Sequence, residues 1–123
     1  MADTHLDRDV LSALQEVMES EYPMLVDTFL ADSEERLSIL RKSDDALQLM
    51  NAAHSFKGSS SNVGAIRLAQ LCNELEQRAR HRPIEGCETL IVEIDKEFDF
   101  IRPLYEAERL RSQAELATVR RPS

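Results

Sequence analysis

Residues 54–64 read His54-Ser55-Phe56-Lys57-Gly58-Ser59-Ser60-Ser61-Asn62-Val63-Gly64. The apolar residues around this stretch recur at helical spacing, yet it carries Gly58 and then three consecutive serines where a helix favours alanine or leucine. A glycine inside a helix costs about 1 kcal/mol relative to alanine. A helix that accepts this cost beside a histidine and a lysine is predicted to keep space clear for something that docks there.

Outward from this stretch, apolar residues recur at three- and four-residue steps along nearly the whole chain, and no stretch alternates as a half-buried strand does. The sequence therefore predicts an all-α protein. The connections between the later helices are short, which favours an antiparallel up-down four-helix bundle over about residues 20–105. Helices are expected over about residues 7–19, 22–42, 45–61 and 65–80, with another that starts near residue 87.

Both ends of the predicted bundle carry additional helix. The first helix, about residues 7–19, is too short to be a fifth member of the bundle and is expected to cap one end. Pro103 is expected to end or kink the last helix. Residues 104–119 can continue as a charged helix, so that about 104–123 forms a C-terminal extension whose last four residues fray.

Length and composition limit the class of protein. The chain has 123 residues, 42% of them hydrophobic and 31% charged, which fits a single folded domain over residues 1–123. The net charge of −8 argues against a general nucleic-acid binder, because phosphate binding needs a basic face. No apolar run reaches the ~18 residues that span a bilayer, and the first nine residues lack the apolar core of a signal peptide. A cytoplasmic monomer without membrane or nucleic-acid partners is expected.

The basic run near the end of the fourth predicted helix and the two cysteines do not indicate a functional site. The basic run at residues 78–82 is interpreted as the end of a helix, where cations complement the helix dipole. Cys72 and Cys87 have no metal-type spacing and cannot form a disulfide framework of the secreted kind. Cys72 falls on an apolar helical stripe, which predicts a buried free thiol.

A helical wheel places the side chains around His54. The core direction of its helix is set by Ala53 and Ser60, and His54 lies well off that direction, at the edge or on the exposed side. Lys57 at i+3, Gly58 at i+4 and Ser61 at i+7 share its face. An accessible imidazole is therefore expected to have an ammonium group beside it and two small residues beyond.

This set of residues has a chemical logic. A neutral imidazole is a good nucleophile near pH 7 and can accept a phosphoryl group on a ring nitrogen. The product carries about two negative charges, which Lys57 is placed to offset, while Gly58 lets a partner approach the helix backbone. The chain has no nucleotide-binding loop and no acidic pair arranged for Mg²⁺, so a partner would bring the metal. A lone surface histidine usually has no function, and it is the combination that favours phosphoryl transfer.

The string His54-x-Phe56-Lys57-Gly58-Ser59-Ser60-x-x-Val63-Gly64 closely resembles the signature of histidine-containing phosphotransfer (HPt) domains of bacterial two-component phosphorelays. The resemblance covers about residues 10–105, and the layout is similar to that of free-standing HPt proteins of proteobacteria such as pseudomonads. It extends through the following helix at positions that match the family pattern, namely Leu68, Leu71, Cys72, Leu75 and Glu76.

The resemblance implies a four-helix bundle with His54 as the phospho-acceptor, Lys57 as the characteristic lysine and Gly58 as the clearance glycine. It implies a phosphocarrier without catalysis of its own. The phosphoryl group would come from a receiver-domain phosphoaspartate of a hybrid sensor histidine kinase and pass to a response-regulator receiver domain. The chain would need no cofactor and bind no metal, because the receiver domain supplies Mg²⁺.

Supporting residues are expected on neighbouring helices. Glu76 stands where several members of the family have a glutamine that hydrogen-bonds the imidazole, and it can accept a bond from the second ring nitrogen. The alternative is that Glu76 only pairs with Arg80 at i+4; Arg80 itself matches a position that can lie near the phosphate. The apolar stripe of the first helix, with Val10, Leu14 and Val17 on one face and Leu11 and Met18 at its margin, is the predicted docking surface.

Other classes of function stay open on the residues alone. The main alternative is a helical adaptor that binds a kinase or regulator without phosphotransfer, and it predicts binding that is indifferent to His54. A metal or redox protein would need a second ligand near His54 or a paired cysteine, and neither occurs in the sequence.

Overall fold

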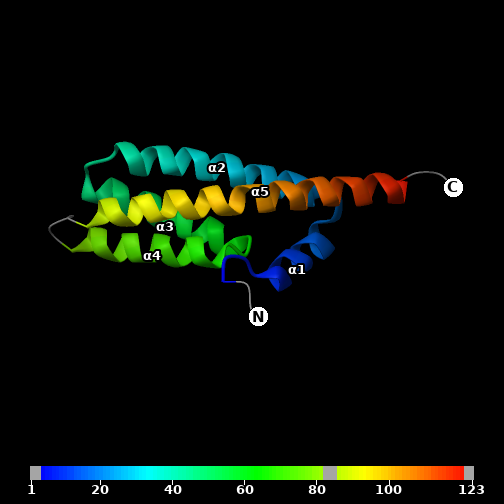
Figure 1. Ribbon diagram of the computed structural model, residues 1–123, viewed down its shortest axis with the longest axis horizontal. Coiled ribbons are helices and arrows are strands. Elements are labelled where there is room, and N and C mark those ends of the chain that lie inside the picture. The colour runs from blue at the N-terminus through cyan, green and yellow to red at the C-terminus, as the bar shows by residue number, and fades with distance from the viewer. Residues whose placement is uncertain (1–3, 82–85, 121–123) are drawn as a thin grey trace.

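The computed structural model describes residues 4–81 and 86–120, the last two by their backbone alone. Within these ranges the regular secondary structure is all helical, as predicted, and a single isolated bridge joins Leu6 and Ala65. Figure 1 shows α2 to α5 side by side along the long axis of the molecule, with α1 set at an angle near one end of the α3–α4 pair. The elements are α1 (Arg8–Met18), the 3₁₀ turn η1 (Glu19–Glu21), α2 (Tyr22–Lys42), α3 (Ala46–Asn62), α4 (Ile66–Arg80) and α5 (Cys87–Arg120).

The core of the bundle is built from the helical stripes that the sequence predicts. On α3, Ala53, Phe56 and Ser60 are buried at i, i+3 and i+7, which turns this stripe toward the other helices. Cys72 on α4 is buried and unpaired, as expected. The largest fully buried side chains come from the N-terminal segment and all five helices: Leu6, Leu11, Tyr22, Leu37, Leu40, Leu49, Phe56, Leu68, Leu71, Leu75, Phe98 and Tyr105.

The turn between α3 and α4 holds the start of the chain. Gly64 has a φ of +75°, and a Cβ atom there would lie 2.9 Å from the carbonyl oxygen of Asp7. The amide of Asp7 donates to the Gly64 carbonyl at 2.8 Å, and the amide of Ile66 donates to the His5 carbonyl at 3.0 Å. Asp7 then caps α1 by accepting bonds from two amides of its first turn. Glycine at position 64 therefore fixes where α1 begins relative to α3 and α4.

The wide apolar stripe of α1, predicted as a docking surface, is divided between the core and solvent. Leu11 is buried and Leu14 and Met18 are partly buried against the core, whereas Val17 is 79% exposed. The reason is tertiary: the anchor at Asp7 sets the rotation of α1, and both stripes are apolar enough to be buried. Leu11 is only 2% exposed, so it cannot offer the docking surface predicted for it. Met18 is partly buried against the core.

Helix α5 does not end at Pro103. It continues to Arg120, because Pro103 and Asp99 both lie on the exposed side. There, water can satisfy the Asp99 carbonyl that loses its helical amide partner. The extension packs on the rest of the molecule: the Tyr105 hydroxyl donates to the Val63 carbonyl at 2.6 Å, and Tyr22 donates to Glu108 at 3.2 Å.

Two sets of predicted features fall partly outside the described residues. Arg82 of the basic run lies in the undescribed stretch 82–85, and most of the predicted frayed end lies in residues 121–123. In the part of the chain that the structure describes, none of the helices combines the length and apolarity that crossing a membrane requires.

Candidate functional site

The imidazole of His54 projects from the middle of α3 into solvent. Its side chain is 68% exposed, although its neighbours Ala53 and Phe56 are completely buried. This contrast follows from helix geometry, because a residue one step from a fully buried position is turned by about 100°. The rigid, buried side of α3 thus positions an accessible histidine at the surface.

A buried carboxylate lies directly beneath this ring. Glu76 on α4 is 2% exposed, and its two oxygens accept bonds from three side chains. Nδ1 of His54 donates to Oε2 at 2.9 Å, the ammonium group of Lys57 donates to Oε1 at 2.7 Å, and Arg80 donates to Oε2 at 3.1 Å. Both alternatives weighed for Glu76 are therefore present together, since it binds the imidazole and also pairs with Arg80.

The charge state of Glu76 assigns the proton on the imidazole. The hydrogen bond from Lys57, followed by those from His54 and Arg80, outweighs the effect of burial and lowers the pKa of Glu76 to about 2. An ionised carboxylate can only accept hydrogen bonds, so the Nδ1 atom that contacts it carries the proton. The second nitrogen, Nε2, then has the free lone pair of the exposed ring.

The rest of the histidine face is small or positively charged. Lys57 is partly exposed and reaches Asn73 on α4 at 3.4 Å as well as Glu76. A Cβ atom on Gly58 would have nothing within 4 Å, so the space above the helix is open at this position. Ser61 is exposed one turn further on.

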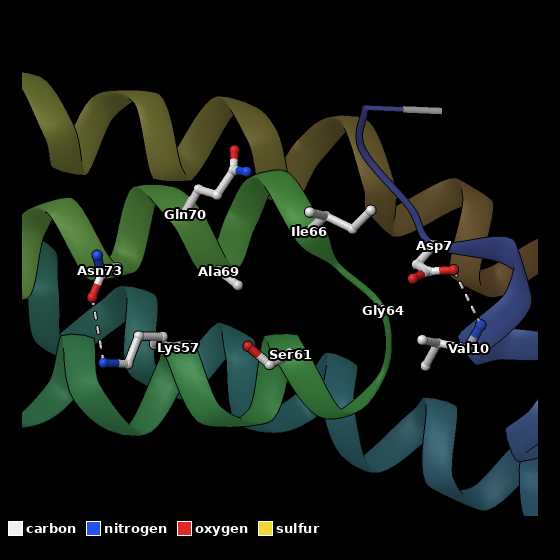
Figure 2. Close-up of a pocket in the computed structure, with 9 residues that line it drawn as sticks. All are labelled: Asp7, Val10, Lys57, Ser61, Gly64, Ile66, Ala69, Gln70 and Asn73. Carbon is white, nitrogen blue, oxygen red and sulfur yellow. Dashed lines mark hydrogen bonds between the residues drawn. The ribbon is translucent and has the colours of Figure 1, made fainter. Parts of the chain in front are cut away.

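A pocket of about 360 Å³ lies next to this face, between the start of α1, the end of α3 and the first turns of α4. Figure 2 shows Lys57 and Ser61 on one side of it and Ile66 and Ala69 on the other, with Val10 of α1 near the glycine turn. The remaining lining residues are Asp7, Gly64, Gln70 and Asn73.

The structure brings most of the predicted site residues together. His54, Lys57, Glu76 and Arg80 form one hydrogen-bonded cluster, which is named the Glu76 cluster below. Gly58 and Ser61 lie along the same face of α3. Sequence reasoning missed Asn73 and the pocket beside Lys57. The spacing of Asn73 three residues before Glu76 was the one available signal, since i and i+3 share a helix face.

The comparisons with known proteins assign the chain to a family. The family model described as the Hpt domain matches residues 24–103, so the chain belongs to the Hpt domain family. Among the curated proteins compared, none matches the chain significantly.

Solved structures narrow the type of Hpt protein. The chain is similar to the crystal structure of histidine-containing phosphotransfer protein B (HptB) from Pseudomonas aeruginosa PAO1, with 50% sequence identity and a TM-score of 0.86; the match covers 89% of this chain and 98% of that one. A histidine-containing phosphotransfer protein from Medicago truncatula shares 26% identity at a TM-score of 0.74, covering 97% and 86% of the two chains. A putative histidine-containing phosphotransfer protein from rice shares 18% sequence identity at a TM-score of 0.76, and the match covers 91% of this chain and 84% of that one. At this identity the match supports the fold alone.

Family membership establishes the general activity. Hpt phosphotransfer proteins are phosphocarriers that interact with receiver domains of kinases and response regulators, and this chain is a histidine phosphotransfer protein of the HptB type. The similarity to the Pseudomonas protein supports a bacterial origin. Among the residues that the structure describes, no group of three histidine, cysteine or acidic side chains could hold a metal ion.

Proposed function

We propose that His54 accepts a phosphoryl group on Nε2 from a receiver-domain phosphoaspartate of a hybrid sensor histidine kinase and passes it to the receiver domain of a response regulator. The observation that carries this proposal is the bond between Nδ1 of His54 and the buried carboxylate of Glu76. It leaves the nucleophilic nitrogen on the exposed side of the ring, where a second protein can reach it.

The neighbouring residues have supporting roles in the transfer. The Nε2 lone pair attacks phosphorus in line while the bond to the aspartate oxygen breaks. The ammonium group of Lys57 then offsets part of the charge on the phosphoryl oxygens, and Gly58 leaves room for the approaching domain. The chain supplies position and charge; in this proposal the receiver domain brings Mg²⁺ and its own acidic pocket.

The pocket beside Lys57 is the proposed docking surface. Its apolar lining comes from Val10, Ile66 and Ala69, and it adjoins the histidine face. Val10 belongs to the predicted stripe of α1, whereas Leu11 of that stripe is buried. The Glu76 cluster beside the pocket, in which Lys57 and Arg80 face one carboxylate, carries one net positive charge on a chain whose net charge is −8. A cationic face suits the acidic phosphorylation pocket of a receiver domain and favours rapid, transient association. A monomer in the cytoplasm stays a prediction.

The test is phosphotransfer profiling with labelled receiver domains and Mg²⁺. A cognate receiver should give an acid-labile phosphohistidine on the wild-type protein and none on His54→Gln. The matched control is His81→Gln, an exposed histidine at the end of α4, which should leave labelling unchanged. Receiver binding without transfer, equal in wild type and His54→Gln, would instead support the adaptor function.

A further inference from the structure

The Glu76 cluster has a charge pattern that bears on the phosphorylated state. Two cations, Lys57 and Arg80, face a single carboxylate. With a neutral imidazole, the four side chains therefore carry one net positive charge. A phosphoryl group adds about two negative charges. If the ring keeps its Nδ1 proton it carries one positive charge, and the phosphorylated cluster is neutral; if the ring loses that proton, one negative charge stays uncompensated.

The position of the Nδ1 proton also favours its retention. It points at Oε2 of Glu76 at 2.9 Å, and that carboxylate is 98% buried beneath the ring. Glu76 is itself a poor base, because its hydrogen bonds hold its pKa near 2. An uncompensated negative charge so close to a buried carboxylate is unfavourable, whereas a positive ring against that carboxylate is stabilised.

Other titratable groups around the cluster do not change this balance. Arg36 on α2 donates to Ser55, and Asp7 caps its own helix α1. Cys72 lies one turn before Glu76, and burial raises the pKa of its thiol to about 12, which keeps it neutral. Within the described residues, the charges that bear directly on Glu76 come from Lys57 and Arg80, besides the ring of His54.

We infer that Glu76 holds the Nδ1 proton on the ring throughout the phosphorylated state, so that the carrier receives and returns a phosphoryl group without moving a proton. This inference rests on the proposed role of His54. On loading, the Nε2 lone pair forms the bond to phosphorus and the aspartate oxygen leaves with its electron pair. On unloading, a receiver carboxylate attacks phosphorus and the electron pair of the N–P bond returns to Nε2.

The consequence concerns the leaving group. A ring that keeps its proton departs as neutral imidazole, whereas a ring without it must depart as an imidazolate anion, which is a much poorer leaving group. Glu76 thereby keeps the phosphohistidine ready for onward transfer. An amide at this position would orient the ring equally well but would not neutralise its positive charge. Glu76 is therefore a positioning residue whose negative charge is the essential property.

The experiment uses the whole protein phosphorylated by phosphoramidate, which transfers a phosphoryl group to imidazole with release of ammonia and needs no partner. Mass spectrometry locates the label, and ³¹P NMR follows the resonance between about pH 6 and 9, the range in which histidine chemistry titrates. The wild-type resonance should show no ring titration in this range. Glu76→Gln should bring the titration into it, with at least a tenfold loss of proton affinity. Equal titration of the two proteins would overturn the inference.

Two controls separate the charge of Glu76 from its structural role. Glu74→Gln removes the same charge from an exposed position on α4 and should titrate like wild type, and Glu76→Asp should restore much of the proton affinity. If Glu76→Gln fails to fold, the phosphorylated wild type is titrated folded and in urea. The ring should then lose its proton at lower pH in the unfolded chain, and equal values would overturn the inference.

The outcomes also distinguish this inference from the proposed function. If no phosphorylated receiver labels His54 while the titrations behave as expected, the relay role fails and the inference about the proton stands. If receivers transfer normally but the titrations coincide, the relay role stands and the inference fails. A phosphoramidate label on another residue in place of His54 would refute both.

Discussion

Two substitutions test the role of the glycine at position 58. Gly58→Ala should raise the stability of the fold, and Gly58→Leu should slow phosphotransfer. Gly58 lies inside α3, and a Cβ atom there would meet nothing within 4 Å. No contact inside the protein therefore requires glycine. Gly58→Ala should raise the free energy of unfolding by about 0.5–1 kcal/mol, because alanine has the higher helix propensity and restricts the unfolded chain.

The size of this effect is measurable by denaturation. For a small domain with an m-value of about 1–3 kcal/mol/M in urea, a gain near 1 kcal/mol moves the midpoint up by about 0.3–1 M. The melting temperature should rise by about 3–5 °C. Gly58→Leu should also keep the helix but should slow transfer from a phosphorylated receiver at least ~10-fold, because its side chain occupies the space that the receiver must approach.

Gly64→Ala is the matched control within the same motif. Gly64 has a φ of +75°, and an added Cβ atom would lie 2.9 Å from the Asp7 carbonyl oxygen. The free energy of unfolding of Gly64→Ala should therefore fall by about 1–3 kcal/mol. A lower midpoint for Gly58→Ala would show that glycine at position 58 serves internal packing. Normal transfer by a folded Gly58→Leu protein would refute the clearance argument.

Three further predictions concern single side chains. The folded-state pKa of Glu76 is about 2, below its ordinary 4.5, so its ionised form should contribute ~3 kcal/mol to the free energy of unfolding above about pH 4.5, and this contribution is lost as the pH falls toward 2. The urea midpoint of Glu76→Gln should therefore depend less on pH over this range than that of the wild type. Parallel curves for the two proteins would contradict the assignment. Lys57→Met should slow labelling of His54 by about 10–100-fold while circular dichroism stays unchanged, and an unchanged rate would remove its electrostatic role. Tyr105→Phe should lose about 1–2 kcal/mol in urea denaturation, because the buried Val63 carbonyl loses its 2.6 Å bond, and a neutral effect would argue against that contact.

Much of the fold and site follows from local sequence pattern. Helix limits are predicted to within about two residues through α4, because caps, apolar periodicity and glycines are local signals. His54, Lys57, Gly58 and Ser61 fall on one face because that placement needs only the helical repeat.

Two features of the fold stay open in the sequence pattern alone. Both apolar stripes of α1 are suitable for burial, and the burial of Leu11 rather than Val17 depends on the hydrogen bonds that join Asp7 to Gly64 and Ile66 to His5. The continuation of α5 through Pro103 depended on which side of the helix faces water. Neither choice can be read from residue spacing.

The sequence by itself determined the all-α class, the family signature and the presence of an accessible histidine with a lysine and a clearance glycine along its helix, because each of these is a property of one contiguous stretch. The tertiary structure decided which nitrogen of His54 is free and which surface adjoins it. Those depend on how α4 sets Glu76 beneath the ring, 22 residues further along the chain, and on how the glycine turn brings α1 to the pocket beside Lys57.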